Sequence, residues 1–165
     1  MIPKRLNALR SFMEEHNLHA FIIPSSDPHL SEYPASHWAS REWISGFTGS
    51  AGTIVVTRDK AGLWTDSRYF LQADKQLQNS GIDLYKEGLP STPTYTDWLL
   101  SELNNGNNIG IDGNVFSSKD ALILKSRIQA EGIDLITEFD PFESIWSNRP
   151  QIPTNTIFTL PIEFS

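Results

Sequence analysis

Residues 43–74 read WISGFTGSAGTIVVTRDKAGLWTDSRYFLQAD, and this stretch decides the fold. It opens with a loop marked by three glycines spaced three residues apart, Gly46, Gly49 and Gly52. Two short apolar runs, 53–56 and 63–65, come next, with a polar segment that contains glycine between them. This order predicts a hairpin of two antiparallel strands.

A helix is predicted to begin near Asp66, because Phe70, Ala73 and Leu77 share one face at helical spacing. We expect Asp66 to cap this helix and Arg68 to lie in its first turn. The positive end of the helix dipole disfavours a guanidinium at that position unless an anion is present. Arg68 therefore has two interpretations: a surface ion pair with Asp66, or a fork that binds an anion together with free helix N–H groups.

The rest of the chain alternates between helical and strand patterns. Helices are predicted at 3–17, 37–45, 95–103 and 118–130, and strands at 20–24, 82–86, 109–112 and 133–138. Thr94 with Asp97, and Ser117 with Asp120, have the spacing of capping boxes. Alternation favours a largely parallel sheet, whereas the hairpin requires antiparallel pairing. The sequence predicts an α/β fold, with a mixed five- or six-stranded sheet and helices on both faces.

Length and composition fit one globular domain, since the 165 residues are 39% hydrophobic and 20% charged. The absence of cysteine excludes disulfides and thiolate metal sites, and is compatible with a reducing cytoplasm. A formal net charge of −7 without a cluster of lysine and arginine argues against a nucleic-acid partner. The sequence shows neither a signal peptide nor an apolar run long enough to span a membrane.

Two groups of residues could carry chemistry, and neither has a catalytic signature. The glycines follow a G-x-x-G-x-x-G spacing, unlike nucleotide-binding loops, so we expect them to allow close backbone packing. The loop 25–35 contains the potential metal ligands Asp27, His29 and Glu32, with His37 nearby. Such loops more often use Asp and Ser to cap their own turns. Trp38, beside this loop, is the tryptophan expected to face a partner.

The last segment combines recurring prolines with densely spaced apolar side chains at Ile157, Phe158, Leu160, Ile162 and Phe164. A solvated tail would not normally carry that much apolar surface. We expect the segment to pack on a following domain or on a neighbouring molecule, and the chain to be a fragment of a longer protein.

Three motifs in order, IPSSDPHLSEY, SGFTGSAGT and LWTDSRYFLQA, closely resemble the N-terminal domain of Xaa-Pro aminopeptidases of the creatinase/prolidase group. The resemblance is to the long cytosolic form and runs from about residue 6 to the end of the chain; Ser67 stands where glycine is common. It implies a ribonuclease-H-like α/β domain at 1–147 and a linker at 148–165 that leads to a missing domain.

The resemblance also implies a division of labour. Removal of the N-terminal residue before proline belongs to a C-terminal domain with two divalent metal ions, commonly Mn²⁺, so this chain is expected to hold no catalytic residue or metal. Arg68 matches a substrate-binding arginine, and the matching loop 27–33, including Tyr33, has a supporting place near the domain interface, with Trp38 and Asp66 as further candidates. A cytoplasmic homodimer acting on peptides with proline second is implied, without nucleic acid or membrane partners.

Two other functions stay open on the sequence. The chain could be a free-standing module that binds peptides or proteins without peptidase activity. It could also be an autonomous metallohydrolase built on Asp27, His29 and Glu32.

Overall fold

The computed structural model of the chain describes residues 1–156 and residue 159. In this part of the chain, six strands form one sheet in the order β4-β3-β2-β1-β5-β6. The prediction of a mixed sheet is confirmed, with six strands. They are β1 (Ala20–Ile23), β2 (Thr53–Thr57), β3 (Ala61–Thr65), β4 (Asp83–Lys86), β5 (Asn108–Ile111) and β6 (Asp134–Ile136).

Of the six described strands, only β2 runs antiparallel to the others. It pairs antiparallel with β1 and β3, whereas β1–β5, β5–β6 and β3–β4 are parallel pairs. The predicted hairpin joins β2 to β3, and Thr57 N donates to Lys60 O across its turn at 2.9 Å. The carboxyl ends of the other five strands therefore meet at one edge of the sheet, together with the start of β2.

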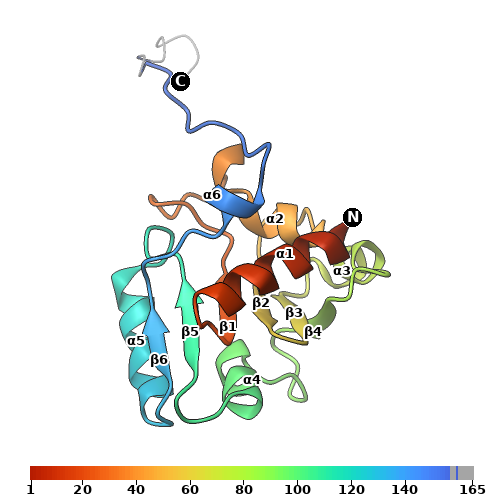
Figure 1. Cartoon of the computed structure of the whole chain (residues 1–165). Coiled ribbons are helices and arrows are strands. Elements are labelled where there is room, and N and C mark those ends of the chain that lie inside the picture. The colour runs from red at the N-terminus through yellow and green to blue at the C-terminus, as the bar shows by residue number, and fades with distance from the viewer. Residues whose placement is uncertain (157–158, 160–165) are drawn as a thin grey trace.

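Helices cover both faces of the sheet (Figure 1). One face packs against α1, α2, α3 and α6, and the other packs against α4 and α5. The helices are α1 (Ile2–Glu15), α2 (Ser40–Ser45), α3 (Phe70–Gln76), α4 (Tyr95–Glu102), α5 (Ser118–Gln129) and α6 (Phe142–Ile145), with a 3₁₀ turn η1 (Ser36–Trp38) before α2. None of the helices in the described ranges has the length and apolarity that crossing a membrane requires.

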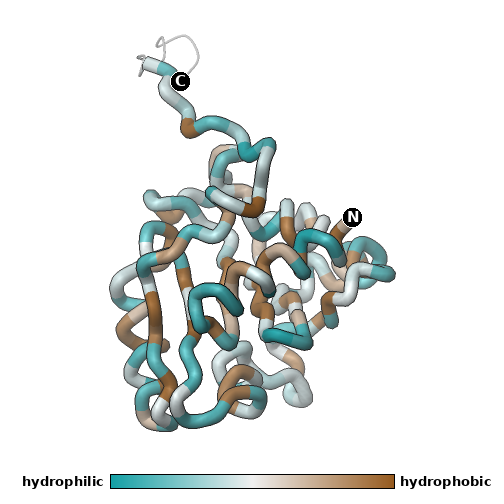
Figure 2. The backbone as a smooth tube through the Cα atoms, viewed as in Figure 1, coloured by the Kyte–Doolittle hydropathy of each residue, from teal (hydrophilic) through white to brown (hydrophobic). Residues whose placement is uncertain are grey.

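The sheet separates two hydrophobic cores, because successive strand residues point to opposite faces. In β1, Phe21 and Ile23 pack under α1, while Ala20 and Ile22 face the side of α4 and α5. All four residues of β1 are buried, as its apolar run predicts. Figure 2 shows hydrophobic residues along the central strands and hydrophilic residues in the surface loops.

Local signals at helix ends are confirmed in several places. The hydroxyls of Thr94 and Ser117 accept hydrogen bonds from the backbone N–H of Asp97 and Asp120, at 3.1 and 3.0 Å. Gly46 ends α2 with a positive φ of 74°, a conformation that glycine adopts without strain.

Three details of the sequence prediction are wrong or incomplete. The segment 37–45 forms η1 and α2 instead of one helix. The helix expected at Asp66 begins at Phe70, so Arg68 precedes it. Asp66 Oδ1 instead accepts from Arg68 N at 3.0 Å, a local turn that competes with helix initiation. The short helix α6 had no counterpart in the prediction, and the apolar tail at 157, 158, 160, 162 and 164 lies outside the described residues.

Gly62 lies in β3 beside two stacked aromatic rings. The rings of Trp64 and Tyr85 stack at 4.1 Å with an angle of 3° between their planes. A Cβ at Gly62 would lie 2.6 Å from Trp64 and 2.7 Å from Tyr85. Gly62→Ala should lower the free energy of unfolding by about 1–3 kcal/mol, the usual cost of overpacking, as measured by urea denaturation.

The same variant should change the near-UV circular dichroism, because the ring stack must open. Gly106→Ala is the control: its φ is +84° with open space around the added methyl, so it strains the backbone but leaves the rings alone. A Gly62→Ala protein with unchanged stability and an unchanged near-UV spectrum would contradict the prediction.

Asp112 follows β5 directly and forms an isolated bridge with Glu138. Burial raises the pKa of the Asp112 carboxyl, and the charge of Asp140 adds to the rise, while the backbone N–H of Asn114 opposes it. The folded protein therefore favours the protonated form of the Asp112 carboxyl more strongly than the unfolded chain does. Its contribution to stability is fully present below the unfolded pKa and is lost as the pH rises through the higher folded pKa.

Asp112→Asn should accordingly stabilise the protein at pH 7 and lose this advantage on acidification toward pH 4. The amide oxygen can still accept from Asn114 N, so the local turn is retained. Thermal unfolding of both proteins across this pH range checks the prediction. A stability difference that is constant with pH would exclude titration of Asp112 as its cause.

Candidate functional site

Three loops meet at the sheet edge that carries the carboxyl ends of the parallel strands. The loop 24–35 follows β1, and the turn 66–69 follows β3. The glycine loop, defined here as residues 46–52, precedes β2 and reaches the same edge because β2 is antiparallel. Every site residue predicted from the sequence lies in or beside these loops, at the edge where ligands commonly bind in α/β sheets.

Asp27 organises its own loop. Its carboxyl is buried, with 4% of the residue exposed, and Oδ1 accepts from His29 N and Ser31 N at 2.9 Å each. The hydrogen bond from Ser31 N is the main cause that lowers the pKa of Asp27. The carboxylate is thus engaged as a turn cap. His29, Glu32 and Tyr33 are exposed beside it, and in residues 1–156 and 159 no three His, Asp or Glu side chains gather as a metal-binding group.

Arg68 forms a two-pronged ion pair with Asp66. Nε donates to Oδ1 at 2.9 Å and Nη2 donates to Oδ2 at 2.8 Å. This contact raises the pKa of Arg68 and lowers that of Asp66. The charge of Glu32 also contributes to the raised pKa of Arg68, so the loop 24–35 approaches this turn. The Arg68 side chain remains 66% exposed.

Arg68 therefore forms the predicted surface pair with Asp66, but this pair leaves some N–H donors of the guanidinium without an acceptor in the part of the chain that the structure describes. Arginine has five N–H donors, and Asp66 accepts from two of the side-chain groups. Among the described residues, Nη1 has no acceptor. The guanidinium lies over the ring of Tyr69, with Cζ 5.2 Å from the ring centroid. The arrangement can present one edge of an oriented guanidinium to an anion or a carbonyl.

Arg41 is a residue of this site that the sequence interpretation missed. Only 7% of it is exposed, and its guanidinium donates to the carbonyls of Phe47 and Gly49 in the glycine loop. Burial lowers the pKa of Arg41 to about 10. Its Nε is buried without a partner in the described part of the chain. The available signal was an arginine two residues before Trp43, in the helical segment that leads into the glycine loop.

A pocket of about 190 Å³ lies between the loop 24–35, the start of α2 and the glycine loop. Its walls combine apolar surface with charged side chains, and Trp38 and Tyr33 contribute the aromatic part. Tyr33 is 80% exposed. The lining residues that matter for the argument are Glu32, Tyr33, Trp38, Arg41 and Ser50.

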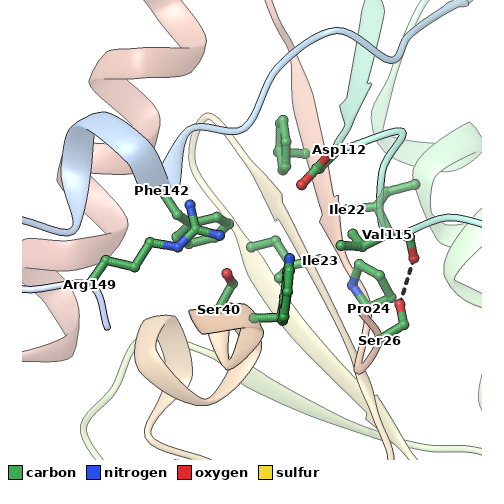
Figure 3. Close-up of a pocket in the computed structure, with 11 residues that line it drawn as sticks. Ile22, Ile23, Pro24, Ser26, Ser40, Asp112, Val115, Phe142 and Arg149 are labelled. Carbon is green, nitrogen blue, oxygen red and sulfur yellow. Dashed lines mark hydrogen bonds between the residues drawn. The ribbon is translucent and has the colours of Figure 1, made fainter. Parts of the chain in front are cut away.

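A second, smaller pocket of about 20 Å³ lies where the C-terminal segment crosses the edge of the sheet (Figure 3). Arg149 and Asp112 point toward it from opposite sides, and Ser26 Oγ donates to Val115 O at 2.6 Å beside it. This volume holds about one water molecule. It is a packing space within the edge, too small for a substrate group.

His37 takes part in a latch instead of a metal cluster. Its Nδ1–H donates to Pro150 O at 2.7 Å, and Arg149 Nε donates to His37 O at 2.9 Å. Arg149 also forms a largely buried ion pair with Asp140. Nearby, the ring of Trp146 stacks on Trp43 at 5.1 Å. We call the segment 146–150, held by these contacts, the exit latch. Residues 151–156 follow it and extend away from the domain (Figure 1).

Comparison with known proteins agrees with these features. Residues 5–143 match the model of the creatinase/prolidase N-terminal domain. A probable Xaa-Pro aminopeptidase P of Laccaria bicolor is 41% identical over 98% of the chain, and Xaa-Pro aminopeptidase 2 of Rattus norvegicus is 43% identical over 98%. The chain spans about a quarter of the length of these relatives, 25% and 24% respectively.

A solved structure is similar over nearly the whole fold. The X-prolyl aminopeptidase of Caenorhabditis elegans, described as a cytosolic enzyme with a di-nuclear active site, superimposes with a TM-score of 0.87 at 32% identity. The alignment covers 93% of this chain and 26% of the nematode enzyme. The chain therefore belongs to the creatinase/prolidase N-terminal domain family, in the branch found in Xaa-Pro aminopeptidases.

Proposed function

We propose that this chain is the non-catalytic N-terminal part of an Xaa-Pro aminopeptidase and that it positions the peptide substrate. The relatives that match nearly all of it are named as such peptidases and are about four times as long. One observation carries the proposal, namely the exposed Arg68 guanidinium, held on one side by Asp66 and open on the other.

An open guanidinium edge suits a peptide. It can pair with the carboxylate of a short substrate or donate to a backbone carbonyl of a longer one. Because Asp66 and Tyr69 already restrict the side chain, less conformational entropy is lost on binding. Such a contact fixes the length and register of the peptide without taking part in bond cleavage.

Cleavage itself is assigned to a following domain. We place the present domain at 1–147 and a linker at 148–165, with two divalent metal ions, Mn²⁺ being expected, bound by residues beyond this chain. Two metals would activate water for attack on the bond before proline. The di-nuclear site described for the nematode relative supports this proposal. The 165 residues alone should then be inactive, and the full-length enzyme is proposed to be a cytoplasmic homodimer.

The loop 24–35 is proposed to support the contact between the two domains. Asp27 keeps it rigid, and His29, Glu32 and Tyr33 are exposed on it. Trp38, half-buried at the wall of the larger pocket, extends the same surface. An exposed aromatic ring beside charged groups is typical of residues that are covered by a partner.

The alternative is a free-standing module that binds peptides or proteins. The exposure of Leu30 and Tyr33 on one loop favours it, since such side chains often anchor partners. The reading frame beyond Ser165 distinguishes the two functions, because only the first requires a metallopeptidase domain there.

Arg68→Ala in the full-length enzyme should lower kcat/KM by about 10- to 100-fold, as expected for loss of a charge-assisted contact. Metal content should not change, because Arg68 is not a proposed ligand. Steady-state kinetics on peptides of three to nine residues, with metal analysis of each preparation, measure both quantities.

Lys60→Ala is the matched control. Lys60 also forms an exposed ion pair, with Glu102 at 2.7 Å, at the opposite end of the sheet. Its removal should leave the kinetics unchanged. Wild-type kinetics for Arg68→Ala on all peptide lengths would exclude a substrate contact of Arg68 and leave it only its surface ion pair with Asp66.

A further inference from the structure

The glycine loop is fastened by side chains along almost its whole length. Side chains outside the loop donate to or accept from its backbone at Phe47, Thr48, Gly49, Ala51 and Gly52. Arg41 supplies two of them, and Gln76, Thr65 and Ser25 supply others. A loop without a regular backbone ladder is thereby held in one conformation.

Glycine at position 49 lets a tyrosine ring approach this loop. A Cβ there would lie 2.3 Å from the ring of Phe47 and 2.8 Å from Cδ1 of Tyr69. The Tyr69 ring instead meets the Phe47 ring edge-on at 5.9 Å. The missing side chain of Gly49 thus creates the space in which Tyr69 packs.

The hydroxyl of Tyr69 is fixed as well. It shares a hydrogen bond of 2.7 Å with Ser50 Oγ, so that both the ring and the hydroxyl contact the glycine loop. Tyr69 in turn lies under the Arg68 guanidinium. An unbroken series of contacts therefore leads from the buried Arg41 through the glycine loop and Tyr69 to the exposed Arg68.

We propose that Ser50 and Tyr69 are positioning residues, through which the glycine loop sets the orientation of the Arg68 guanidinium toward the peptide. The inference rests on the proposed substrate contact of Arg68 and adds the residues that aim it. Asp66 restrains the guanidinium from one side, while the Tyr69 ring restrains its plane. Loss of the Ser50–Tyr69 bond lets the ring turn, and the guanidinium turns with it.

The test is a double-mutant cycle in the full-length enzyme. Tyr69→Phe keeps the ring and removes the hydroxyl, and Ser50→Ala removes the other partner. Each should lower kcat/KM for a peptide by about 3- to 10-fold, mainly through KM, the scale of one lost hydrogen bond. The double variant should lose no more than either single one, and Ser50→Thr, which keeps a hydroxyl, should retain activity.

The decisive comparison is made in the Arg68→Ala background. There, Tyr69→Phe should have no further effect, because the group that Tyr69 positions is absent. Ser101→Ala is the control: it removes a hydroxyl that donates to Trp98 O at 2.7 Å on α4, far from the site, and should leave the kinetics unchanged.

The possible results separate the two proposals. Reduced activity of Arg68→Ala with wild-type activity of Tyr69→Phe overturns the positioning role and leaves the proposed function standing. An effect of Tyr69→Phe that persists undiminished without Arg68 also overturns it, since the role is then structural. Wild-type activity of Arg68→Ala overturns the proposed function, and the positioning role with it.

Discussion

The antiparallel course of β2 between β1 and β3 is the constraint on which the site depends. If β2 ran parallel to its neighbours, the loop before it would emerge at the opposite edge of the sheet. Its reversal brings the glycine loop beside the loop after β1 and the turn after β3. Three segments separated by up to about 40 residues in the sequence thus become neighbours through a single strand direction.

A buried positive charge holds this junction together. Arg41 remains protonated at neutral pH, because its lowered pKa of about 10 is still well above 7. Burial of an unpaired charge is costly, and two backbone carbonyls compensate only part of that cost. Those carbonyls belong to the loop that approaches Tyr69. The burial of Arg41 therefore lowers the stability of the fold but fixes the conformation of this loop.

Features that depend on residues close together in the sequence could be predicted from it, whereas features that depend on distant residues could not. The β2–β3 hairpin and the caps at Thr94 and Ser117 depend on residues a few positions apart, and all are confirmed. The predicted helix start at Asp66 was wrong because two local structures compete there. The Asp66 carboxylate accepts from Arg68 N in a turn and does not cap a helix. A single sequence carries both signals without their relative energies.

Interactions across the fold were beyond sequence reasoning. The bond between His37 and Pro150 joins residues 113 positions apart, and nothing in either neighbourhood indicates the other. Arg41 was missed because its acceptors are backbone carbonyls, which every residue possesses. The family resemblance directed attention to Arg68, whereas the contacts that hold Arg68 became visible only with Tyr69 and the glycine loop in place.

The exit latch has a consequence for whatever follows residue 156. Because the ring of Trp146 stacks on Trp43, Arg149 donates to His37 O and His37 donates to Pro150 O, the backbone is held against the domain as far as residue 150. A polypeptide attached there starts its path from a fixed point and heading. Its effective concentration near the sheet edge that carries Arg68 then depends on the length of chain after residue 150, because the chain before it is held in place.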